Sequence, residues 1–317
     1  MDQLDRSEQN QDRYLARADQ LQKRAAREIG LPPGLLPAPL TLVQWLVKLR
    51  PTLRPASWRQ YRAAIFASLE HLRTEEAGLA MLELLQADSG PCLRRPTRPR
   101  TGGQKMRRLP QADLETLLAH FEAHPSLWSA GTALWLQAGR TTGLRPCEWP
   151  SAQLFHKGGE HILVIRNAKN SNGRSHGEFR HLQLGLLDAE ALRILQAMLE
   201  WVEHVQADAS WRAAYEGCRK ALHRACRRLW TRRKRYPSLY SGRHQFAADG
   251  KARGLTPAQL AALMGHAVSD TAAEHYGQGR YGQGGFVIQP DSEEVARVID
   301  RPVGRAEKLR NGARLRP

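Results

Sequence analysis

The sequence predicts a mainly helical protein, in which a small all-helical domain precedes a larger α+β domain. Three observations indicate this class. Apolar residues recur every three or four positions in most segments, as they do in amphipathic helices. One segment, 161–184, is rich in β-forming residues on both sides of a turn and predicts a small hairpin. A stretch near residue 100 is rich in Pro, Gly and cations and has no periodicity, which is typical of a linker.

The first domain is expected over residues 1–96 and should contain helices only. The segment 12–29 has helical spacing and alternating charge, and the prolines that follow it end the helix. Two further amphipathic helices are expected after this break, with Thr41 and Ser57 as their N-caps. A basic linker over 97–108 then separates this domain from the second one.

The second domain is expected over residues 109–285. It should begin with helices, continue with the hairpin strands 161–167 and 178–184, and then return to helix. The helix that follows Thr256 has clear ends: Thr256 and Gln259 form a capping box, Pro257 is its first residue, and Gly265 stops it. His266 therefore lies just past a well-defined helix end.

The last part, 286–317, should contain one short amphipathic helix and a basic tail without fixed structure.

Charge is the strongest global signal. The 317 residues include 48 Lys and Arg against 31 Asp and Glu, which gives a net charge of +17 and an isoelectric point near 10.4. Such a balance favours a polyanionic partner, most often nucleic acid, and a merely basic enzyme is the alternative. No apolar run is long enough to span a membrane, and the polar start is unlike a signal peptide. The four cysteines show no metal-binding or disulfide spacing, so a reducing cytoplasm and no metal are expected.

The densest charge lies in 219–235, which carries nine cations and no acid. This density requires either a polyanion or open solvent. The candidate DNA-binding residues are Arg219, Lys220, Arg227, Arg228, Arg232, Arg233, Lys234 and Arg235.

Several separate segments carry residues that are ordinary one by one but fit one reaction together. An arginine at a helix end, a hairpin lysine, a histidine after glycine and a late tyrosine each have a packing or solvation explanation. A tyrosine hydroxyl has a pKa of about 10 and can attack a phosphodiester when the charge that develops on phosphorus is neutralised. Two arginines do this well, because each guanidinium binds phosphate oxygens with paired hydrogen bonds. A lysine or histidine then moves the protons, and fixed cations make a metal unnecessary.

The motifs that carry these residues resemble those of the tyrosine recombinases, the phage-integrase family. The segment 141–149, TTGLRPCEW, is similar to the first arginine box of that family. The segment 241–277 is similar to its second arginine box followed by its nucleophile segment. The resemblance covers 109–280 closely and 41–90 in the style of the helical core-binding domain. It implies a DNA-binding domain over 1–96 and a catalytic domain of the integrase fold over 109–285.

The resemblance also implies a role for each matching residue. Tyr276 would be the nucleophile that forms a 3′-phosphotyrosyl bond. Arg145 and Arg243 would clamp the scissile phosphate, and Lys169 would protonate the 5′-hydroxyl that leaves. His266 would hydrogen-bond the phosphate and assist proton transfer. Two supporting residues accompany these: Glu148, which would orient Arg145, and His244.

Two departures from the family pattern stand out. The family has a histidine three residues before the second arginine, where this chain has Tyr240. A phenol can donate a hydrogen bond to a phosphate but cannot carry the positive charge, so proton transfer would fall mainly to His266. The interval from His266 to Tyr276 is also one residue longer than expected, which leaves Tyr281 as a second candidate nucleophile.

The resemblance implies a site-specific recombinase of a mobile element, either an integrase or a resolvase. It would act on double-stranded DNA with paired inverted sites, assemble four protomers and proceed through a Holliday junction without ATP or a cofactor. It would lie in the cytoplasm with the nucleoid, and the short helix after residue 290 would dock on a neighbouring subunit. Two alternatives stay open: a type IB topoisomerase-like enzyme, and a non-catalytic DNA-binding homologue, which Tyr240 keeps under consideration.

Overall fold

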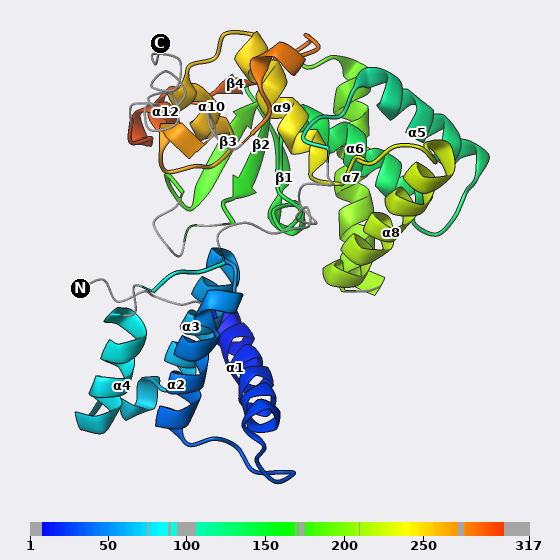
Figure 1. Ribbon diagram of the computed structural model, residues 1–317. Helices are drawn as coiled ribbons and strands as arrows, with labels where there is room; N and C mark the ends of the chain where they lie inside the picture. Colours follow the sequence, from blue (N-terminus) through cyan, green and yellow to red (C-terminus); the bar gives the residue numbers. More distant parts are fainter. Residues whose placement is uncertain are drawn as a thin grey trace, which may run out of the picture. The chain divides into compact units, whose positions relative to one another are not determined.

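The computed structural model describes residues 8–74, 76–87, 90–93, 106–168, 170, 175–208, 210–271 and 276–300. The chain divides into two compact units, Met1–Arg100 and Thr101–Pro317, whose elements are labelled in Figure 1. Each unit has its own hydrophobic core. The predicted class, mainly helical with one small sheet in the second unit, is confirmed.

The first unit is all-helical in its described part, as predicted. It contains α1 (Glu8–Ile29), α2 (Pro39–Leu49), α3 (Pro55–Ser68) and α4 (Glu76–Ala87), with 3-10 turns at Arg50–Thr52 and Glu70–Thr74. The core side chains Leu42, Leu46, Ile65 and Leu85 are fully buried. They come from three different helices, so the core depends on all three being formed.

The predicted N-caps of α2 and α3 are wrong. The two helices begin earlier, at Pro39 and Pro55, and their N-caps are Ala38 and Arg54, neither of which makes a side-chain capping bond. A proline at the first helical position has the right φ and lacks only an N–H that has no partner there. The proline therefore sets the helix start in place of the Thr41 or Ser57 hydroxyl.

In the second unit, helices α5 (Gln111–Ala123), α6 (Ser129–Thr142), α7 (Ala189–Asp208) and α8 (Trp211–Leu229) gather on one side in Figure 1. Helices α9 (Ser241–Ala252), α10 (Pro257–Leu263) and α12 (Ser292–Arg297) follow, with 3-10 turns at Trp149–Ser151 and Gly279–Tyr281. Helix α6 packs against α5, α7, α8 and α9. Its end is therefore held from several directions, which fixes the loop that follows it.

The sheet has four antiparallel strands in the order β1 (Gln153–Lys157), β2 (Glu160–Arg166), β3 (Phe179–Gln183) and β4 (Gln289–Pro290). The pair β2–β3 is the predicted hairpin, whereas β1 and β4 were not predicted. Strands β1 and β2 are joined by Gly158 and Gly159, both with positive φ. A two-residue turn of this kind favours glycine at both positions.

The segment 286–297 packs on its own unit. Strand β4 pairs with β3, and α12 packs against α10. The side chain of Glu294 is buried and accepts hydrogen bonds from the backbone N–H and Nδ1 of His181.

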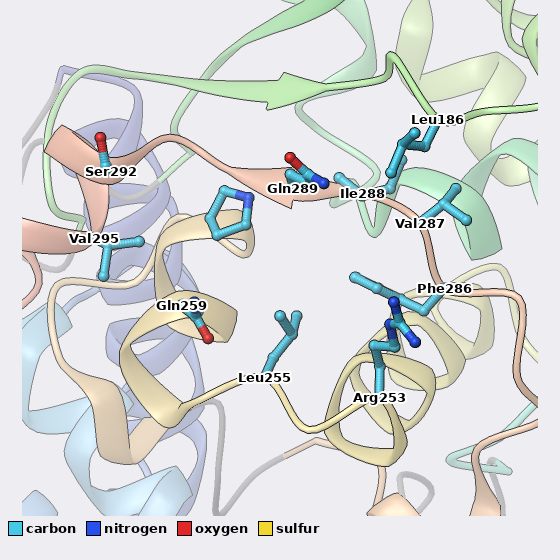
Figure 2. A pocket seen from close by; sticks show the side chains of 11 residues that line it. Leu186, Arg253, Leu255, Gln259, Phe286, Val287, Ile288, Gln289, Ser292 and Val295 are labelled. Atoms are coloured by element: carbon cyan, nitrogen blue, oxygen red, sulfur yellow. The ribbon is translucent and has the colours of Figure 1, made fainter.

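A hollow of about 480 Å3 lies between the segment 286–297 and the loop around Leu255, with Phe286 and Val295 pointing into it (Figure 2). The hollow is lined by none of the predicted site residues.

The boundary between the two units, at residues 100 and 101, lies inside the predicted linker 97–108. Residues 97–105 lie outside the described part of the chain. Met106, which follows them, is attached to the second unit, because it donates its N–H to the carbonyl of Tyr236 and accepts from the Ser241 hydroxyl. The tail 301–317 likewise lies outside the described residues.

Candidate active site

The buried carboxylate of Glu148 is the centre of the site. Its Oε1 accepts from Nη1 of Arg145 at 2.5 Å, and its Oε2 accepts from the backbone N–H of Arg145 at 2.7 Å. Oε2 also accepts from Nη2 of Arg180 at 2.7 Å, and Nη1 of Arg243 lies 3.8 Å away. Three guanidinium groups from different segments thus converge on one carboxylate.

The convergence begins with the way α6 ends. Gly143 adopts the left-handed conformation, with φ of 66°, and its N–H donates to Gly139. A β-carbon at Gly143 would lie 2.5 Å from the ring of Phe246, so no larger residue fits there without a shift. The turn reverses the chain and returns Arg145 to the core, where its side chain is 4% exposed. The predicted pair of Arg145 and Glu148 is present.

Arg243 lies on α9 and links the ends of two other helices. Its Nη1 donates to the carbonyl of Gly143, after α6, and its Nη2 donates to the carbonyl of Met264, after α10. The side chain is 1% exposed. These bonds fix the plane of the guanidinium, and with it the position of the charge.

His266 follows the end of α10, as predicted. The N–H of His266 donates to Ala261 and that of Gly265 to Ala262, which is a Schellman end with Gly265 at φ of 63°. The capping box of Thr256 and Gln259 at the other end is confirmed. Nε2 of His266 lies 3.1 Å from Nη2 of Arg243. Because a guanidinium only donates, Nε2 is the acceptor, and the imidazole carries its hydrogen on Nδ1.

Tyr276 is half-buried among aromatic and cationic side chains. Its ring centroid lies 5.2 Å from that of His266 and 5.2 Å from that of His244. The guanidinium carbon of Arg243 lies 5.2 Å from the same ring. The hydroxyl oxygen of Tyr276 is 2.9 Å from that of Tyr240. The structure therefore brings together five of the six predicted catalytic residues: Arg145, Tyr240, Arg243, His266 and Tyr276.

The pKa values of the two phenols are shifted in opposite directions. Burial would raise the pKa of Tyr276, but the charge of Arg243, the hydrogen bond from Tyr240 and the charge of Arg145 lower it to about 8. Burial raises the pKa of Tyr240 to about 12, against the lowering effect of Arg243. Tyr276 is therefore the phenol that ionises first, with Tyr240 as its hydrogen-bond donor.

The supporting residues are shifted as well. Burial, together with the charges of Arg107 and Arg243, lowers the pKa of His244 to about 4, so His244 is neutral near pH 7. Burial alone would raise the pKa of Glu148, but the charges of Arg180, Arg145 and Arg243 hold it well below its ordinary value. Glu148 is thus ionised throughout the physiological range.

Several buried donors of the clamp have no hydrogen-bond partner among the described residues. These atoms are Nε and Nη2 of Arg145 and Nε of Arg243. A buried donor left unpaired costs about 1 to 3 kcal/mol. A phosphate, with several acceptor oxygens and negative charge, is the kind of group that satisfies such donors.

Two further predictions concern Lys169 and Tyr281. Lys169 lies outside the described residues, so its predicted role stays a prediction. Tyr281 is 38% exposed, and its ring contacts Arg108 and Arg280, at 5.0 and 4.9 Å from the guanidinium carbons. Between the two candidate nucleophiles, Tyr276 is the one whose ring meets the clamp arginine Arg243.

The eight predicted DNA-binding cations lie on α8 and the loop after it, and all are exposed. Two of them have acidic partners. Arg219 is paired with Glu216 on the same helix. Arg233 makes a two-point ion pair with the nearly buried Asp113, at 2.7 and 3.0 Å, and lies over the ring of Trp230. Arg233 therefore helps to hold α5 and the loop together, whatever else it contacts.

Sequence reasoning missed Arg180, a fully buried residue on β3. A signal was present in the alternation of this strand. Arg180 shares a face with Leu182, and both are buried while Phe179 is exposed. An arginine on the apolar face of a strand needs a buried partner, because an unpaired charge is not tolerated there.

Among the described residues, no group of three or more His, Cys, Asp or Glu side chains is placed to hold a metal ion. In the same part of the chain, no helix has the length and apolar character that a membrane crossing requires.

No family model matches this chain, and no curated protein matches it in sequence. Two similar solved structures are crystal structures of XerH site-specific recombinase, one bound to palindromic difH substrate in a post-cleavage complex and one bound to difH substrate in a pre-cleavage complex. The first has a TM-score of 0.46 and 15% identity, and covers 94% of this chain and 76% of that chain. The second has a TM-score of 0.46 and 14% identity, and the match covers 88% of this chain and 70% of that chain.

Proposed function

We propose, from the side chains around Tyr276, that this protein is a DNA strand-transfer enzyme of the tyrosine recombinase type. The observation that carries the proposal is the meeting of one phenol of lowered pKa with two buried arginines that retain unpaired donors. Phosphoryl transfer to a phenol needs this combination: a nucleophile that ionises and fixed positive charge at the phosphate.

In the proposed reaction, the Tyr276 hydroxyl first loses its proton to solvent, which its lowered pKa favours. The phenolate oxygen then attacks phosphorus and forms a phosphotyrosyl bond, and the 5′-oxygen of the next nucleotide leaves. Arg145 and Arg243 neutralise the charge that develops on the non-bridging oxygens. Tyr240 holds the Tyr276 oxygen by its hydrogen bond until the phosphate arrives. Lys169, in the role that the motif implies, protonates the leaving oxygen. Rejoining is the same step in reverse, with a 5′-hydroxyl attacking the phosphotyrosine, so the bond energy is kept.

The two clamp arginines, Arg145 and Arg243, are covered by other side chains in this structure. Arg145 and Arg243 are 4% and 1% exposed, so a phosphate reaches them only when covering side chains move. The Tyr276 ring, which lies against the guanidinium of Arg243, is one of these. Catalytic contacts often tighten only in the complex with substrate, and an enzyme of this kind gains from keeping its nucleophile covered until then.

The finer parts of the proposal follow the motif resemblance. We propose recombination between paired inverted sites, with four protomers and a Holliday junction. The XerH structures named above contain site-specific recombinase with its substrate DNA. Residues 286–297 pack on β3 and α10 of their own chain. Assembly of protomers through these residues therefore requires them to leave that position.

The experiment that tests the proposal is covalent capture of DNA. The protein is incubated with a library of random duplexes, each nicked so that the short fragment that carries the free 5′-hydroxyl diffuses away after cleavage. Denatured adducts are then isolated and sequenced. The DNA-linked peptide is then identified by mass spectrometry. We expect adducts on Tyr276 and an enriched target sequence.

Two variants sharpen this test. Tyr276→Phe should lose adducts at least a thousandfold and retain noncovalent DNA binding, whereas Tyr281→Phe, the matched control, should retain both. Adducts on Tyr281 would identify that residue as the nucleophile. If no library gave an adduct, the protein would be a non-catalytic DNA-binding protein. If adducts form but one site and one protomer suffice to relax supercoiled DNA, the protein acts as a topoisomerase instead.

A further inference from the structure

We propose that Arg180 is a positioning residue of this site, an inference that rests on the proposed function. Arg180 neutralises Glu148, so that the charges of Arg145 and Arg243 stay available to a phosphate. It also ties together three segments that carry catalytic residues.

The contacts of Arg180 reach all three segments. Its Nη2 donates to Oε2 of Glu148 at 2.7 Å, in the loop that carries Arg145. Its Nη1 donates to Oδ1 of Asn167 at 2.6 Å, just past the end of β2 and two residues before Lys169. Its Nε donates to the carbonyl of Leu263 at 3.0 Å, three residues before His266. All three guanidinium nitrogens are therefore used on the protein itself.

The role of Arg180 therefore differs from that of the two clamp arginines. Arg145 and Arg243 each retain a buried Nε without a partner among the described residues, and Arg180 does not. Arg180 is also 0% exposed and lies within the sheet, so it is not placed to touch DNA.

Charge balance explains why a third arginine is needed. Glu148 orients Arg145, but its negative charge also attracts Arg243, whose Nη1 is 3.8 Å away. With two arginines and one carboxylate the site would hold one net positive charge. Arg180 raises this to two, which matches the charge that spreads over the equatorial oxygens during phosphoryl transfer. The carboxylate thus keeps its orienting role without cancelling the clamp.

The experiment is a titration of the Tyr276 phenol in the protein without DNA. Tyrosine labelled with 13C at Cζ gives one NMR signal per residue, and Tyr276→Phe assigns the signal of Tyr276. The groups that face this phenol are Arg145, Tyr240, Arg243, His244 and His266. Because Arg180 does not touch Tyr276, a purely structural Arg180 would leave this titration unchanged in a folded variant.

Four variants are compared, with folding checked by circular dichroism and thermal melting. Arg180→Gln should raise the pKa of Tyr276 by about one unit, as expected for the loss of one nearby charge. Glu148→Gln should lower it. The double variant Glu148→Gln, Arg180→Gln should return it to within a few tenths of the wild-type value, because the net charge is restored. Arg180→Lys, which keeps the charge and loses the three-way fork, should also stay close to wild type.

The double variant keeps the test decisive if Arg180→Gln does not fold, because removing both members of a buried ion pair is better tolerated than removing one. A pKa of Tyr276 that stays at the wild-type value in Glu148→Gln, or that shifts in the double variant as far as in Arg180→Gln, overturns the proposal. These titrations need no DNA. A failure of covalent capture would therefore contradict the proposed function without contradicting the role of Arg180 in the charge balance. In the capture assay, Arg180→Gln should slow adduct formation at least tenfold with unchanged DNA affinity.

Discussion

The hydroxyl oxygens of Tyr240 and Tyr276 lie 2.9 Å apart. Since the pKa of Tyr240 is raised to about 12 and that of Tyr276 is lowered to about 8, Tyr240 keeps its proton and donates a hydrogen bond to the Tyr276 oxygen. The residue that departs from the family pattern is thus in direct contact with the candidate nucleophile. A phenol here cannot supply positive charge, but it stabilises the phenolate of its neighbour.

Replacing Tyr240 should therefore shift the pH dependence of cleavage. Tyr240→Phe removes a donor to the phenolate, and a hydrogen bond to a charged group is worth about 1.5 to 3 kcal/mol, or about one to two pKa units. The pKa of Tyr276 should rise by that amount. The logarithm of kcat/KM for adduct formation rises with pH until Tyr276 is ionised, and this rising, acid-side limb should move to higher pH by one to two units.

The rate difference between Tyr240→Phe and the wild type should depend on pH, and this dependence is the control. At pH 7 the variant should be about ten to a hundredfold slower than the wild type. Near pH 10 the two rates should agree within about twofold, because Tyr276 is then largely ionised in both proteins. Tyr281→Phe should follow the wild-type profile throughout. If Tyr240→Phe were slower by the same factor at every pH, Tyr240 would act on the phosphate and not on Tyr276.

The sequence was sufficient to predict the position of His266 past a helix end, because the capping box at Thr256 and the glycine at 265 mark the two ends of that helix. These are short-range rules about helix ends, so they can be read from one chain. Arg145 was identified by the resemblance of its motif, and the left-handed turn at Gly143 that returns it to the core was not predicted.

What the sequence could not predict depends on long-range contacts. Strand β4 is only two residues long and owes its existence to β3, more than a hundred residues earlier. The buried side of its strand marks Arg180 as needing a partner, but its three partners, Glu148, Asn167 and Leu263, lie in other segments. The Tyr240–Tyr276 contact likewise spans 36 positions. No local propensity encodes such pairs.

Protein stability at low pH should depend on Glu148. Its folded pKa is depressed, against the effect of burial, by Arg180, Arg145 and Arg243, so it contributes stability above its unfolded pKa of about 4.5. That contribution is lost as the pH falls through the folded pKa. Urea unfolding of the wild type should therefore show a loss of stability that begins near pH 5 and continues as the pH falls toward the folded pKa. Glu148→Gln should be less stable by about 3 to 5 kcal/mol at pH 7 and should lack that part of the slope.

The matched control is Glu190→Gln, which removes an exposed carboxylate paired with Arg193 on α7. It should change stability by less than about 1 kcal/mol and keep the wild-type pH slope. A Glu148→Gln protein with the full wild-type slope would mean that other carboxylates dominate acid unfolding.

The exposed cations of α8 should contribute to DNA affinity through salt-dependent contacts. Arg227 and Arg228 lie in the last turn of α8, and both are exposed. Changing both to Gln should weaken binding to specific and random duplexes alike. The negative slope of log K against log salt concentration should become shallower by about one to two, since each phosphate contact contributes about 0.9 to its magnitude. Fluorescence anisotropy at several salt concentrations measures this.

Two controls separate charge from structure. Arg193→Gln removes an exposed cation on α7 and should leave the slope unchanged. Arg233→Gln should lower the thermal midpoint, because it leaves the nearly buried Asp113 without its ion pair. A loss of preference for the target site in Arg227→Gln, Arg228→Gln would instead identify these residues as base readers.

A substitution at Gly265 tests how strongly the rate of adduct formation depends on the position of His266. It has φ of 63°, a conformation that costs an L-residue roughly 1 to 2 kcal/mol, and a β-carbon there would lie 2.2 Å from Oδ1 of Asn167. Gly254 also has positive φ, of 89°, but a β-carbon there meets nothing within 4 Å. The two glycines therefore share the backbone strain and differ in the collision.

Gly265→Ala and Gly254→Ala should both lower the free energy of unfolding by about 1 kcal/mol from strain, and Gly265→Ala by more. Only Gly265→Ala should slow adduct formation, by at least a hundredfold, because the collision displaces either His266 or the Asn167 side chain that holds Arg180. Equal activity of the two variants would show that the loop absorbs the added methyl group. In that case the position of His266 relative to Arg243 tolerates more movement than the buried contacts of the site suggest, and the hydrogen bond between them would not limit the rate.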